Sequence, residues 1–486
     1  MNKHLPASGV TSLVAGKQGT SSQTSSIIDP ASGLEVGSLS HADLATVDAA
    51  VQAASDAFPR WRDTAPAQRA RYLMKFRELV EANKQELAEL ITREHGKPVV
   101  DALGSIQRGL EVVEFAMGAP QLLKGENSDH VATGVSTRSS RRPLGVCVGI
   151  TPFNYPAMIP MWMFPVAIAC GNTFILKPSE KTPSAANFLA ELLTKAGVPD
   201  GVLNVVHGGR EVAHALVTHP DVKAVSFVGS SAVARAVYEA GTSAGKRVQA
   251  LGGAKNHAIV MPDADIRSTV SAILNGAFNS AGQRCMAIAV VITVGEAHDM
   301  LMPALREGAA AMKVAPGADA GCEVPPVTTR EQFEKILAAI SSGESEGAKL
   351  VLDCRDPDAG KDGKGYFIGP VIFEGVTTEM RIYREEIFGP VLAVMQVETL
   401  EDAIRLSNSH DLGNGAVLFT SSGKSAQLFE REILCGMPGV NVPVPSPVAY
   451  YSFGGNRGSI FGDLAANGPD GVNFYTRRQV LTSRWS

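Results

Sequence analysis

Short apolar runs alternate with segments of helical periodicity between residues 145 and 262, and this alternation constrains the fold more than any other feature of the chain. Strands joined by helices of this length form a parallel sheet with helices on its faces. The runs predicted as strands are 145–153, 172–180, 201–208, 222–231, 247–253 and 257–262. The segments predicted as helices are 183–197, 210–218 and 232–241. We therefore predict an α/β fold.

The same pattern restarts after residue 265 and predicts a second α/β unit that begins near residue 251. A predicted helix over 266–280 is followed by a predicted strand over 287–294. Earlier helical periodicity covers 43–60, 66–95 and 101–118. Residues 1–26 are rich in Ser, Thr and Gly, which is typical of a flexible lead-in. A length of 486 residues is enough for two or three domains.

Charge and composition exclude several classes of partner. The formal net charge of −5 leaves no basic footprint for nucleic acid. No apolar run reaches the roughly 18 residues that a membrane span requires, so no membrane association is expected. The six cysteines form no CxxC pair and the amino terminus has no signal-peptide core, which favours reduced thiols in the cytoplasm. His207, His214 and His219 lack the HExxH spacing, so no metal site is predicted.

The stretch "NSAGQRCMAI" (279–288) contains the first candidate catalytic residue, Cys285. A free cysteine is more often a small buried hydrophobe than a nucleophile. Here small residues precede it, so that a substrate could approach, and Arg284 is a permanent cation that would favour the thiolate if it faced the sulfur. From these residues alone, a buried spacer and a nucleophile both remain open.

Two strand ends carry candidate cofactor-binding residues. Glu180 follows Lys177 in "LKPSE", and a carboxylate there can accept hydrogen bonds from both ribose hydroxyls of an adenosine, which would favour NAD over NADP. Gly229 and Ser230 lie between a predicted strand and a helix, whose free N–H groups can hold a pyrophosphate. The alternatives are a surface Lys–Glu pair and an ordinary turn, since the GxGxxG fingerprint is absent.

Two further polar residues lie at chain turns. Asn154, in "ITPFNYP", could donate a hydrogen bond to an oxyanion or could stabilise an Asx-turn. Glu386, in "REEIFGP", could contact a ligand or could be a solvated acid at the start of a strand.

Together these motifs resemble the aldehyde dehydrogenase superfamily, and within it the CoA-acylating methylmalonate-semialdehyde dehydrogenases. The resemblance covers about residues 27–486, and "QALGGAKNHAIVMPDAD" together with "GQRCMA" is specific for this branch. The other stretches that carry it are 143–180, 381–392 and 452–463.

The resemblance implies a role for each matching residue. Cys285 would be the nucleophile, and Asn154 would donate to the oxyanion together with the backbone N–H of Cys285. The implied cofactor contacts are Lys177 and Glu180 at the adenosine ribose, Gly229 and Ser230 at the pyrophosphate, Glu386 at the nicotinamide ribose, Phe388 beside the nicotinamide, and Phe153.

The resemblance also implies an architecture. It predicts a Rossmann-type NAD-binding domain, an α/β catalytic domain and an oligomerisation hairpin, assembled as a homodimer or homotetramer. The implied boundaries are a lead-in over 1–26, an NAD-binding domain over 27–127 and 143–250, oligomerisation segments over 128–142 and 472–486, a catalytic domain over 251–440 and a return to the cofactor domain over 441–471.

The chemistry implied is oxidation of an aldehyde through a thioester on Cys285. Hydrolytic relatives carry Glu-Leu-Gly-Gly, whose Glu activates water, whereas this chain reads "ALGG" with Ala250 in that place. Coenzyme A is therefore the expected acceptor, because a thiol needs less activation than water. Activation of water by another carboxylate remains the alternative.

Arg284 and Arg108 are expected to hold the carboxylate of a semialdehyde by charge-assisted hydrogen bonds. Malonate or methylmalonate semialdehyde would then lose CO₂ and give acetyl-CoA or propionyl-CoA.

Several positions depart from the branch: Pro325, Ser446, Asn456, Arg457 and Gly458. We expect them at the rim of the pocket and in loops, where they would affect the choice of aldehyde. A cofactor-independent cysteine acyltransferase and a non-catalytic scaffold are the rival interpretations.

Overall fold

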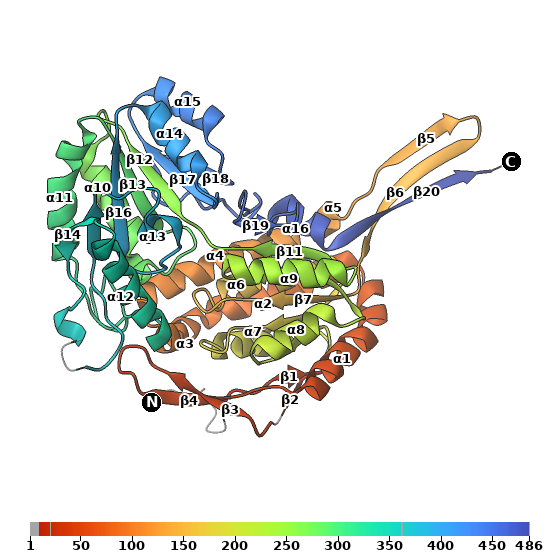
Figure 1. Ribbon diagram of the computed structural model, residues 1–486. Coiled ribbons are helices and arrows are strands. Elements are labelled where there is room, and N and C mark those ends of the chain that lie inside the picture. The colour runs from red at the N-terminus through yellow and green to blue at the C-terminus, as the bar shows by residue number, and fades with distance from the viewer. Residues whose placement is uncertain (1–8, 20, 361–362, 486) are drawn as a thin grey trace.

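The chain folds into two lobes and a projecting arm (Figure 1). The computed structural model describes residues 9–19, 21–360 and 363–485. No helix in these ranges is both long and apolar enough to cross a membrane. The fold class is the predicted one, with two helix-covered sheets that are largely parallel.

The first lobe is built on an eight-stranded sheet of order β19-β11-β10-β7-β8-β9-β1-β2. The central strands pair in parallel, and β1, β2 and β19 pair antiparallel at the edges. The strands are β1 (Leu13–Val14), β2 (Lys17–Gln18), β7 (Val146–Ile150), β8 (Thr173–Lys177), β9 (Leu203–Val205), β10 (Val222–Val228), β11 (Arg247–Leu251) and β19 (Ile460–Phe461).

Helices cover both faces of this sheet, so its central strands are apolar on both sides. On one face Val146 and Val148 pack with α1, α8 and α9, and on the other Cys147 packs with the remaining helices. The helices are α1 (Leu44–Asp63), α2 (Pro66–Ala82), α3 (Lys84–His95), α4 (Val99–Met117), α5 (Ala119–Leu122), α6 (Met158–Ala169), α7 (Ser184–Lys195), α8 (Arg210–Thr218), α9 (Ser231–Ser243) and α16 (Gly468–Phe474).

The second lobe is built on a seven-stranded sheet of order β14-β15-β16-β13-β12-β17-β18, with its own hydrophobic core. Among the described strands of this sheet, β14 alone pairs antiparallel. The strands are β12 (Asn256–Val260), β13 (Ile288–Val294), β14 (Lys349–Asp353), β15 (Val371–Glu374), β16 (Val391–Val397), β17 (Gly415–Phe419) and β18 (Met437–Val440). The helices are α10 (Ile266–Phe278), α11 (Ala297–Ala311), α12 (Arg330–Ser345), α13 (Arg381–Arg384), α14 (Leu400–Ser409) and α15 (Gly423–Glu432), with the short 3₁₀ turns η1 (Asn279–Gly282) and η2 (Asp358–Gly360).

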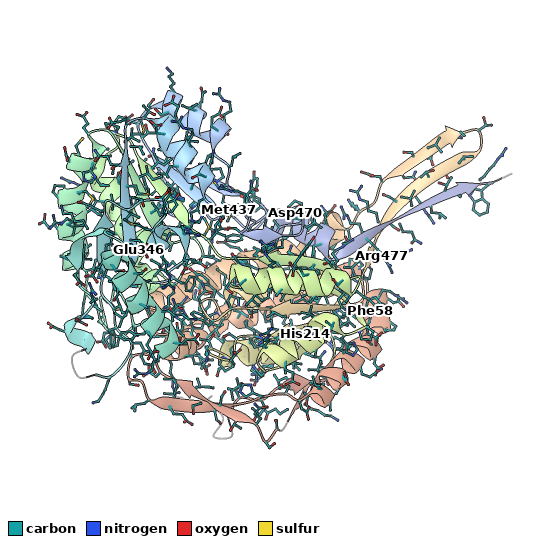
Figure 2. All side chains as sticks on the ribbon, in the orientation of Figure 1. Phe58, His214, Glu346, Met437, Asp470 and Arg477 are labelled. Carbon is teal, nitrogen blue, oxygen red and sulfur yellow. The ribbon has the colours of Figure 1, made fainter. Side chains whose placement is uncertain are left out.

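The arm is a three-stranded sheet formed by β5 (Asn127–Ala132), β6 (Val135–Pro143) and the carboxy-terminal β20 (Thr476–Arg484). β20 pairs antiparallel with the whole length of β6. The arm extends away from both lobes, with Arg477 at its base, and most of the β5 and β20 side chains are exposed (Figure 2). A separate hairpin of β3 (Thr24–Ile28) and β4 (Glu35–Ser40) runs along the first lobe.

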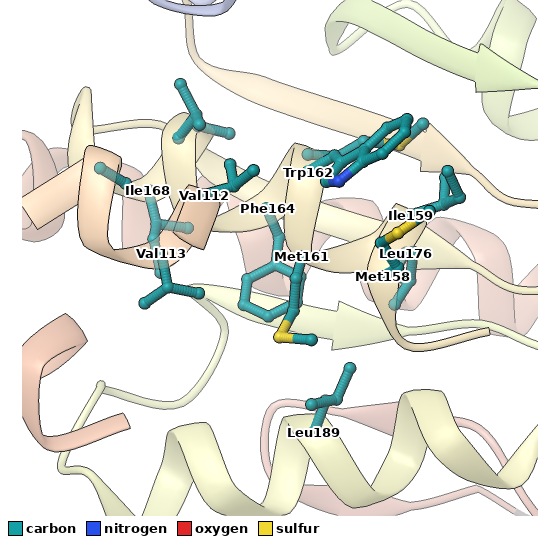
Figure 3. Packing of buried hydrophobic residues seen from close by; sticks show 14 of the residues in the cluster. Val112, Val113, Met158, Ile159, Met161, Trp162, Phe164, Ile168, Leu176 and Leu189 are labelled. Atoms are coloured by element: carbon teal, nitrogen blue, oxygen red, sulfur yellow. The ribbon is translucent and has the colours of Figure 1, made fainter. Parts of the chain in front are cut away.

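The core of the first lobe is centred on α6, whose residues are all buried (Figure 3). Met161 and Phe164 of this helix belong to the same cluster as Val113 of α4 and Leu189 of α7. Full burial of each such side chain contributes about 1.5–3 kcal/mol. No helix is predicted here from the sequence, because a helix buried on every side has no amphipathic period.

One local expectation was wrong. Residues 9–19 and 21–26 are not a flexible lead-in, since β1 and β2 extend the main sheet and Val10 is 4% exposed; residues 1–8 and 20 lie outside the described ranges. The helical periodicity over 66–95 is confirmed and forms two helices, separated at Asn83, whose side-chain amide donates to the Leu79 carbonyl at 2.7 Å.

Candidate active site

The carboxyl ends of four parallel strands meet at one edge of the first sheet. β7 leads into Phe153 and Asn154, and β8 ends at Lys177. β10 leads into Gly229 and Ser230, and β11 leads into the loop after Leu251. Ligands of open α/β sheets bind at this edge, so the topology brings together residues that lie far apart in the sequence.

A cavity of about 430 Å³ opens at this edge and contains most of the residues that the sequence analysis assigned to a cofactor. Glu386 and Phe388 of the second lobe line it from the opposite side. The predicted site residues in its lining are Phe153, Asn154, Gly229, Ser230, Cys285, Glu386 and Phe388.

Lys177 and Glu180 lie outside this lining. The Lys177 ammonium is 3.5 Å from the Glu180 carboxylate and donates to the carbonyl oxygens of Gly208 at 2.5 Å and Pro178 at 2.9 Å. Lys177 is 5% exposed, and burial lowers its pKa. The pair is therefore not the surface ion pair that was one alternative, because its lysine is inside the protein.

A second cavity of about 740 Å³ meets the first at Cys285. Arg108 of α4 and Arg284 line it, as do Lys97, Asp101 and Tyr155. The predicted nucleophile thus lies between a space lined by the cofactor candidates and a space lined by the two predicted carboxylate-binding arginines.

The Cys285 loop is held in a specific conformation. Ser280, Ala281 and Gly282 all have left-handed backbone angles, with φ of 54°, 52° and 67°. A Cβ atom at Gly282 would lie 2.3 Å from the Gly389 carbonyl oxygen, so the position requires glycine. Such backbone strain persists only where the surrounding structure determines it, and it is frequent at active sites.

Side-chain amides fix the loop on both sides of the nucleophile. Asn256 and Asn414 donate to the Cys285 carbonyl oxygen at 2.9 and 3.0 Å. The Asn154 amide donates to the Gln283 carbonyl oxygen at 3.1 Å, which leaves its second N–H for a ligand. These contacts place the predicted oxyanion donor beside the nucleophile loop.

The thiol of Cys285 is not ionised in advance. Burial, and next the negative charge of Glu386, raise its pKa to about 12. Backbone N–H groups of Cys285 and Met286 and the Arg284 guanidinium lower it, but by less. Arg284 therefore lowers the pKa of the thiol, as expected, but the increase caused by burial and Glu386 is larger.

Arg284 is held by a carboxylate that the sequence analysis missed. Its guanidinium donates to Asp101 at 2.9 Å, and Asp101 also accepts from the Ser280 hydroxyl at 2.8 Å. Arg108 donates to the carbonyl oxygens of Ser446 at 3.0 Å and Pro447 at 3.1 Å. Each arginine is thus anchored while it lines the cavity.

Glu386 is a carboxylate of the first cavity with a strongly perturbed environment. Burial raises its pKa to about 7, against the hydrogen bond from the Ala254 N–H at 2.9 Å and the charge of Lys255, which lower it. The Lys255 ammonium donates to the Ile382 and Glu385 carbonyl oxygens, and burial lowers its pKa to about 8.

Ala250 does not lie where the sequence analysis placed it. Its side chain is fully buried in the core between β10 and β19 and lines neither cavity, whereas Gly252 and Gly253 line the first one. The carboxylates in the described lining of that cavity are Glu385 and Glu386. Ala250 therefore does not occupy the position in the cavity from which a glutamate would activate water. The loop that follows it, residues 252–255, also has no acidic side chain.

Some of the positions that depart from the family branch line the pocket, and others do not. Ser446 lines the second cavity, as expected. Asn456, Arg457 and Gly458 line neither cavity, and the Arg457 guanidinium instead donates to the carbonyl oxygens of His410 at 2.6 Å and Leu434 at 2.8 Å. Pro325 is buried. The expectation of a rim position was wrong for Arg457, because its guanidinium closes a turn of the second lobe.

Comparisons with known proteins agree on a family. The profile described as the Aldehyde dehydrogenase family matches residues 17–481. The malonate-semialdehyde dehydrogenase of Pseudomonas aeruginosa is 50% identical over 464 residues, which cover 95% of this chain and 93% of that protein. That of Halalkalibacterium halodurans is 50% identical over 96% of both chains.

Solved structures are equally similar. A methylmalonate-semialdehyde dehydrogenase from Oceanimonas doudoroffii has a TM-score of 0.97 and 48% identity, covering 99% of both chains. A protein of Sinorhizobium meliloti 1021 assigned to the same activity, solved in complex with NAD, has a TM-score of 0.97 and 47% identity, covering 98% of both chains.

Proposed function

This chain belongs to the aldehyde dehydrogenase family, and from that premise we propose that it oxidises a short carboxylated aldehyde with NAD and transfers the acyl group to coenzyme A. The substrate is malonate or methylmalonate semialdehyde, and the products are acetyl-CoA or propionyl-CoA, CO₂ and NADH. One observation carries the proposal: two cavities meet at Cys285, and two arginines line the cavity away from the cofactor candidates.

The first cavity fits a dinucleotide. Gly229 and Ser230 precede α9, and no side chain caps the first N–H groups of that helix, so they are free to bind a pyrophosphate. Glu386 and Phe388 lie across the cavity, as expected for contacts with the nicotinamide ribose and ring. Bound NAD supplies the hydride acceptor. Lys177 orders the end of β8, where Glu180 would reach the adenosine ribose.

Cys285 attacks the aldehyde carbon after its thiol loses a proton. The second N–H of Asn154 and the backbone N–H of Cys285 stabilise the alkoxide that forms. These two N–H donors stabilise the alkoxide effectively because Asn256 and Asn414 already hold the loop, so that it need not reorganise. Loss of hydride from the carbon then leaves a thioester on Cys285.

Arg108 and Arg284 hold the carboxylate of the substrate. They keep this carboxylate close to the thioester carbonyl. CO₂ is lost from this position because the carbonyl delocalises the electron pair left on carbon. The thiol of coenzyme A then takes the acyl group. The absence of an acidic side chain from the described 252–255 loop supports a thiol acceptor.

Hydrolysis to a free acid is the second candidate. Glu386 lines the same cavity as Cys285, and with a pKa raised to about 7 it could accept a proton from water. A cysteine acyltransferase that needs no cofactor is excluded if the protein binds NAD at equilibrium.

We also propose a homodimer or homotetramer, a cytoplasmic location and the domain division given by the sequence. The exposed faces of the β5–β6–β20 arm support assembly, since a thin sheet with both faces in water gains from burial. All six cysteines are free, which supports a reducing compartment. The two separate cores support a cofactor domain and a catalytic domain.

The test is NADH formation from malonate semialdehyde with and without coenzyme A, with products identified by mass spectrometry. Without coenzyme A we expect a burst of about one NADH per site followed by a slow phase, because the acyl-enzyme accumulates. Propanal serves as the uncharged control. Full turnover to a free acid without coenzyme A would reject the thiol acceptor and favour hydrolysis.

A further inference from the structure

Lys97 is a buried lysine that none of the steps above uses. It lies between α3 and α4, follows Gly96, and is 1% exposed. Gly96 ends α3 with φ of 94°, and a Cβ atom there would lie 2.9 Å from Pro30 and 3.0 Å from Pro326, so the chain turns sharply at this point. Despite its burial, Lys97 is part of the lining of the substrate-side cavity together with Cys285.

The Lys97 ammonium has a fixed position. It donates to the Asn154 carbonyl oxygen at 2.5 Å and lies 4.1 Å from the centre of the Tyr155 ring. Its backbone N–H donates to the His95 ring at 3.2 Å. The ammonium is therefore hydrogen-bonded to the residue whose side chain is the proposed oxyanion donor, and it lines the same cavity as Cys285.

Decarboxylation requires a proton donor near Cys285. When the bond between the α-carbon and the carboxylate breaks, its electron pair stays on the α-carbon as a thioester enolate. That carbon must then gain a proton before the acyl group is complete. Water would have to enter the site, or a side chain must supply the proton.

The other ionisable groups of the described cavity lining do not supply it. Arg108 and Arg284 carry guanidinium groups, which do not serve as general acids in proteins. Asp101 is the acceptor in its hydrogen bonds with Arg284 and Ser280. Burial raises the pKa of Tyr155 far above its usual value.

The charges that face Lys97 set its pKa near neutrality. Burial lowers that pKa to about 7, Asp101 and a Cys285 thiolate raise it, and Arg284 lowers it. The thiolate contribution disappears once Cys285 is acylated, which makes the ammonium a better proton donor at the stage where the proton is needed. His95, the neighbouring ring, is held neutral by burial, which lowers its pKa well below the usual range.

We propose that the Lys97 ammonium donates the proton to the carbon from which CO₂ departs, as the proton donor of the decarboxylation step. The inference rests on the proposed function and adds a residue to it. The N–H bond of Lys97 breaks, a C–H bond forms on the α-carbon, and the enolate returns to the thioester. The neutral amine regains a proton when coenzyme A loses its thiol proton, so the complete reaction releases none.

The decisive variant is Lys97→Arg, which keeps the charge and the donor to Asn154 but cannot give up a proton. From malonate semialdehyde we expect acetyl-CoA formation to fall about 100-fold, the lower end of what a positioned general acid contributes, with malonyl-CoA appearing in its place. Propanal yields propionyl-CoA without decarboxylation, so its oxidation should change by less than about threefold. A disturbed Asn154 would slow both aldehydes and would not change the product ratio.

Lys246→Arg is the matched control. Lys246 is also buried, donates to the backbone carbonyls of His219 and Val222, and lines neither cavity. It should leave the product ratio unchanged.

The wild-type protein gives a second test that needs no variant to fold. Raising the pH through about 7 converts the ammonium to the amine, so the ratio of acetyl-CoA to malonyl-CoA should fall, and this pH dependence should be lost in Lys97→Arg. A pH-independent ratio in the wild type, or an unchanged ratio in the variant, overturns the inference. Failure of the wild type to form any acetyl-CoA would instead reject the proposed function.

Discussion

Replacing Arg284 by leucine should weaken the use of a carboxylated aldehyde through two separate effects. The first is the loss of a charge-assisted hydrogen bond to the substrate, about 1.5–3 kcal/mol. The second follows from the structure: Asp101, whose side chain is 22% exposed, loses its cation and remains in the cavity lining as an unpaired negative charge. Two carboxylates about 6 Å apart repel by about 1–3 kcal/mol at an effective dielectric constant of about 20–40.

Added together, the two effects predict that kcat/KM for malonate semialdehyde falls about 10²- to 10⁴-fold in Arg284→Leu. Propanal carries no charge, so its kcat/KM should stay within about threefold. The double variant Arg284→Leu with Asp101→Asn removes the repulsion but not the lost bond. It should recover about 10-fold or more of the activity toward malonate semialdehyde.

The assay measures initial rates of NADH formation at saturating NAD and coenzyme A for both aldehydes. The proteins compared are the wild type, Arg284→Leu, Asp101→Asn and the double variant. Equal losses for propanal and malonate semialdehyde would refute recognition of the carboxylate by Arg284. No recovery in the double variant would refute the repulsion by Asp101 and would assign the whole effect to the lost hydrogen bond.

Four further outcomes are expected. Cys285→Ser should abolish NADH formation and leave the NAD affinity measured by calorimetry nearly unchanged; activity in this variant would reject the nucleophile. Alkylation of Cys285 by iodoacetamide should be slow at pH 8 and faster at higher pH, because the pKa of its thiol is raised to about 12. Glu386→Gln should accelerate that alkylation by removing a negative charge, without reaching the rate of a free thiol, because burial is the larger cause; a slower rate would contradict the assigned sign. Glu180→Ala should narrow the preference for NAD over NADP, measured as the ratio of their kcat/KM values, and an unchanged ratio would remove Glu180 from the adenosine ribose.

The residues at the strand ends could be predicted because their signal is local. The apolar runs of β7, β8 and β10 are bounded by Gly, Pro and Ser, and parallel strands place their carboxyl ends on one edge. Asn154 and Gly229 therefore came together as expected. Cys285 joined them because the loop between α10 and β13 contacts the first lobe, a contact that only the family resemblance implied.

The elements that the sequence did not predict lack a local signal. α6 is buried on every side, so its apolar residues follow no period of 3.6. β1 is two residues long and is stabilised by pairing with β9, almost 200 positions later. In both elements the secondary structure depends on contacts with segments that are distant in the sequence.

The sequence by itself determined the α/β class and the family, because apolar patterning and a dense set of motifs are local properties of the chain, and through the family resemblance it predicted Cys285 as the nucleophile. The tertiary structure alone decided the electrostatics of the site. Burial and then the charge of Glu386 raise the pKa of Cys285, burial lowers that of Lys97 against the charge of Asp101, and an ion pair with Asp101 positions Arg284. Desolvation and Coulomb interactions depend on distances in space, and these groups are brought together only when the two lobes close around the nucleophile loop.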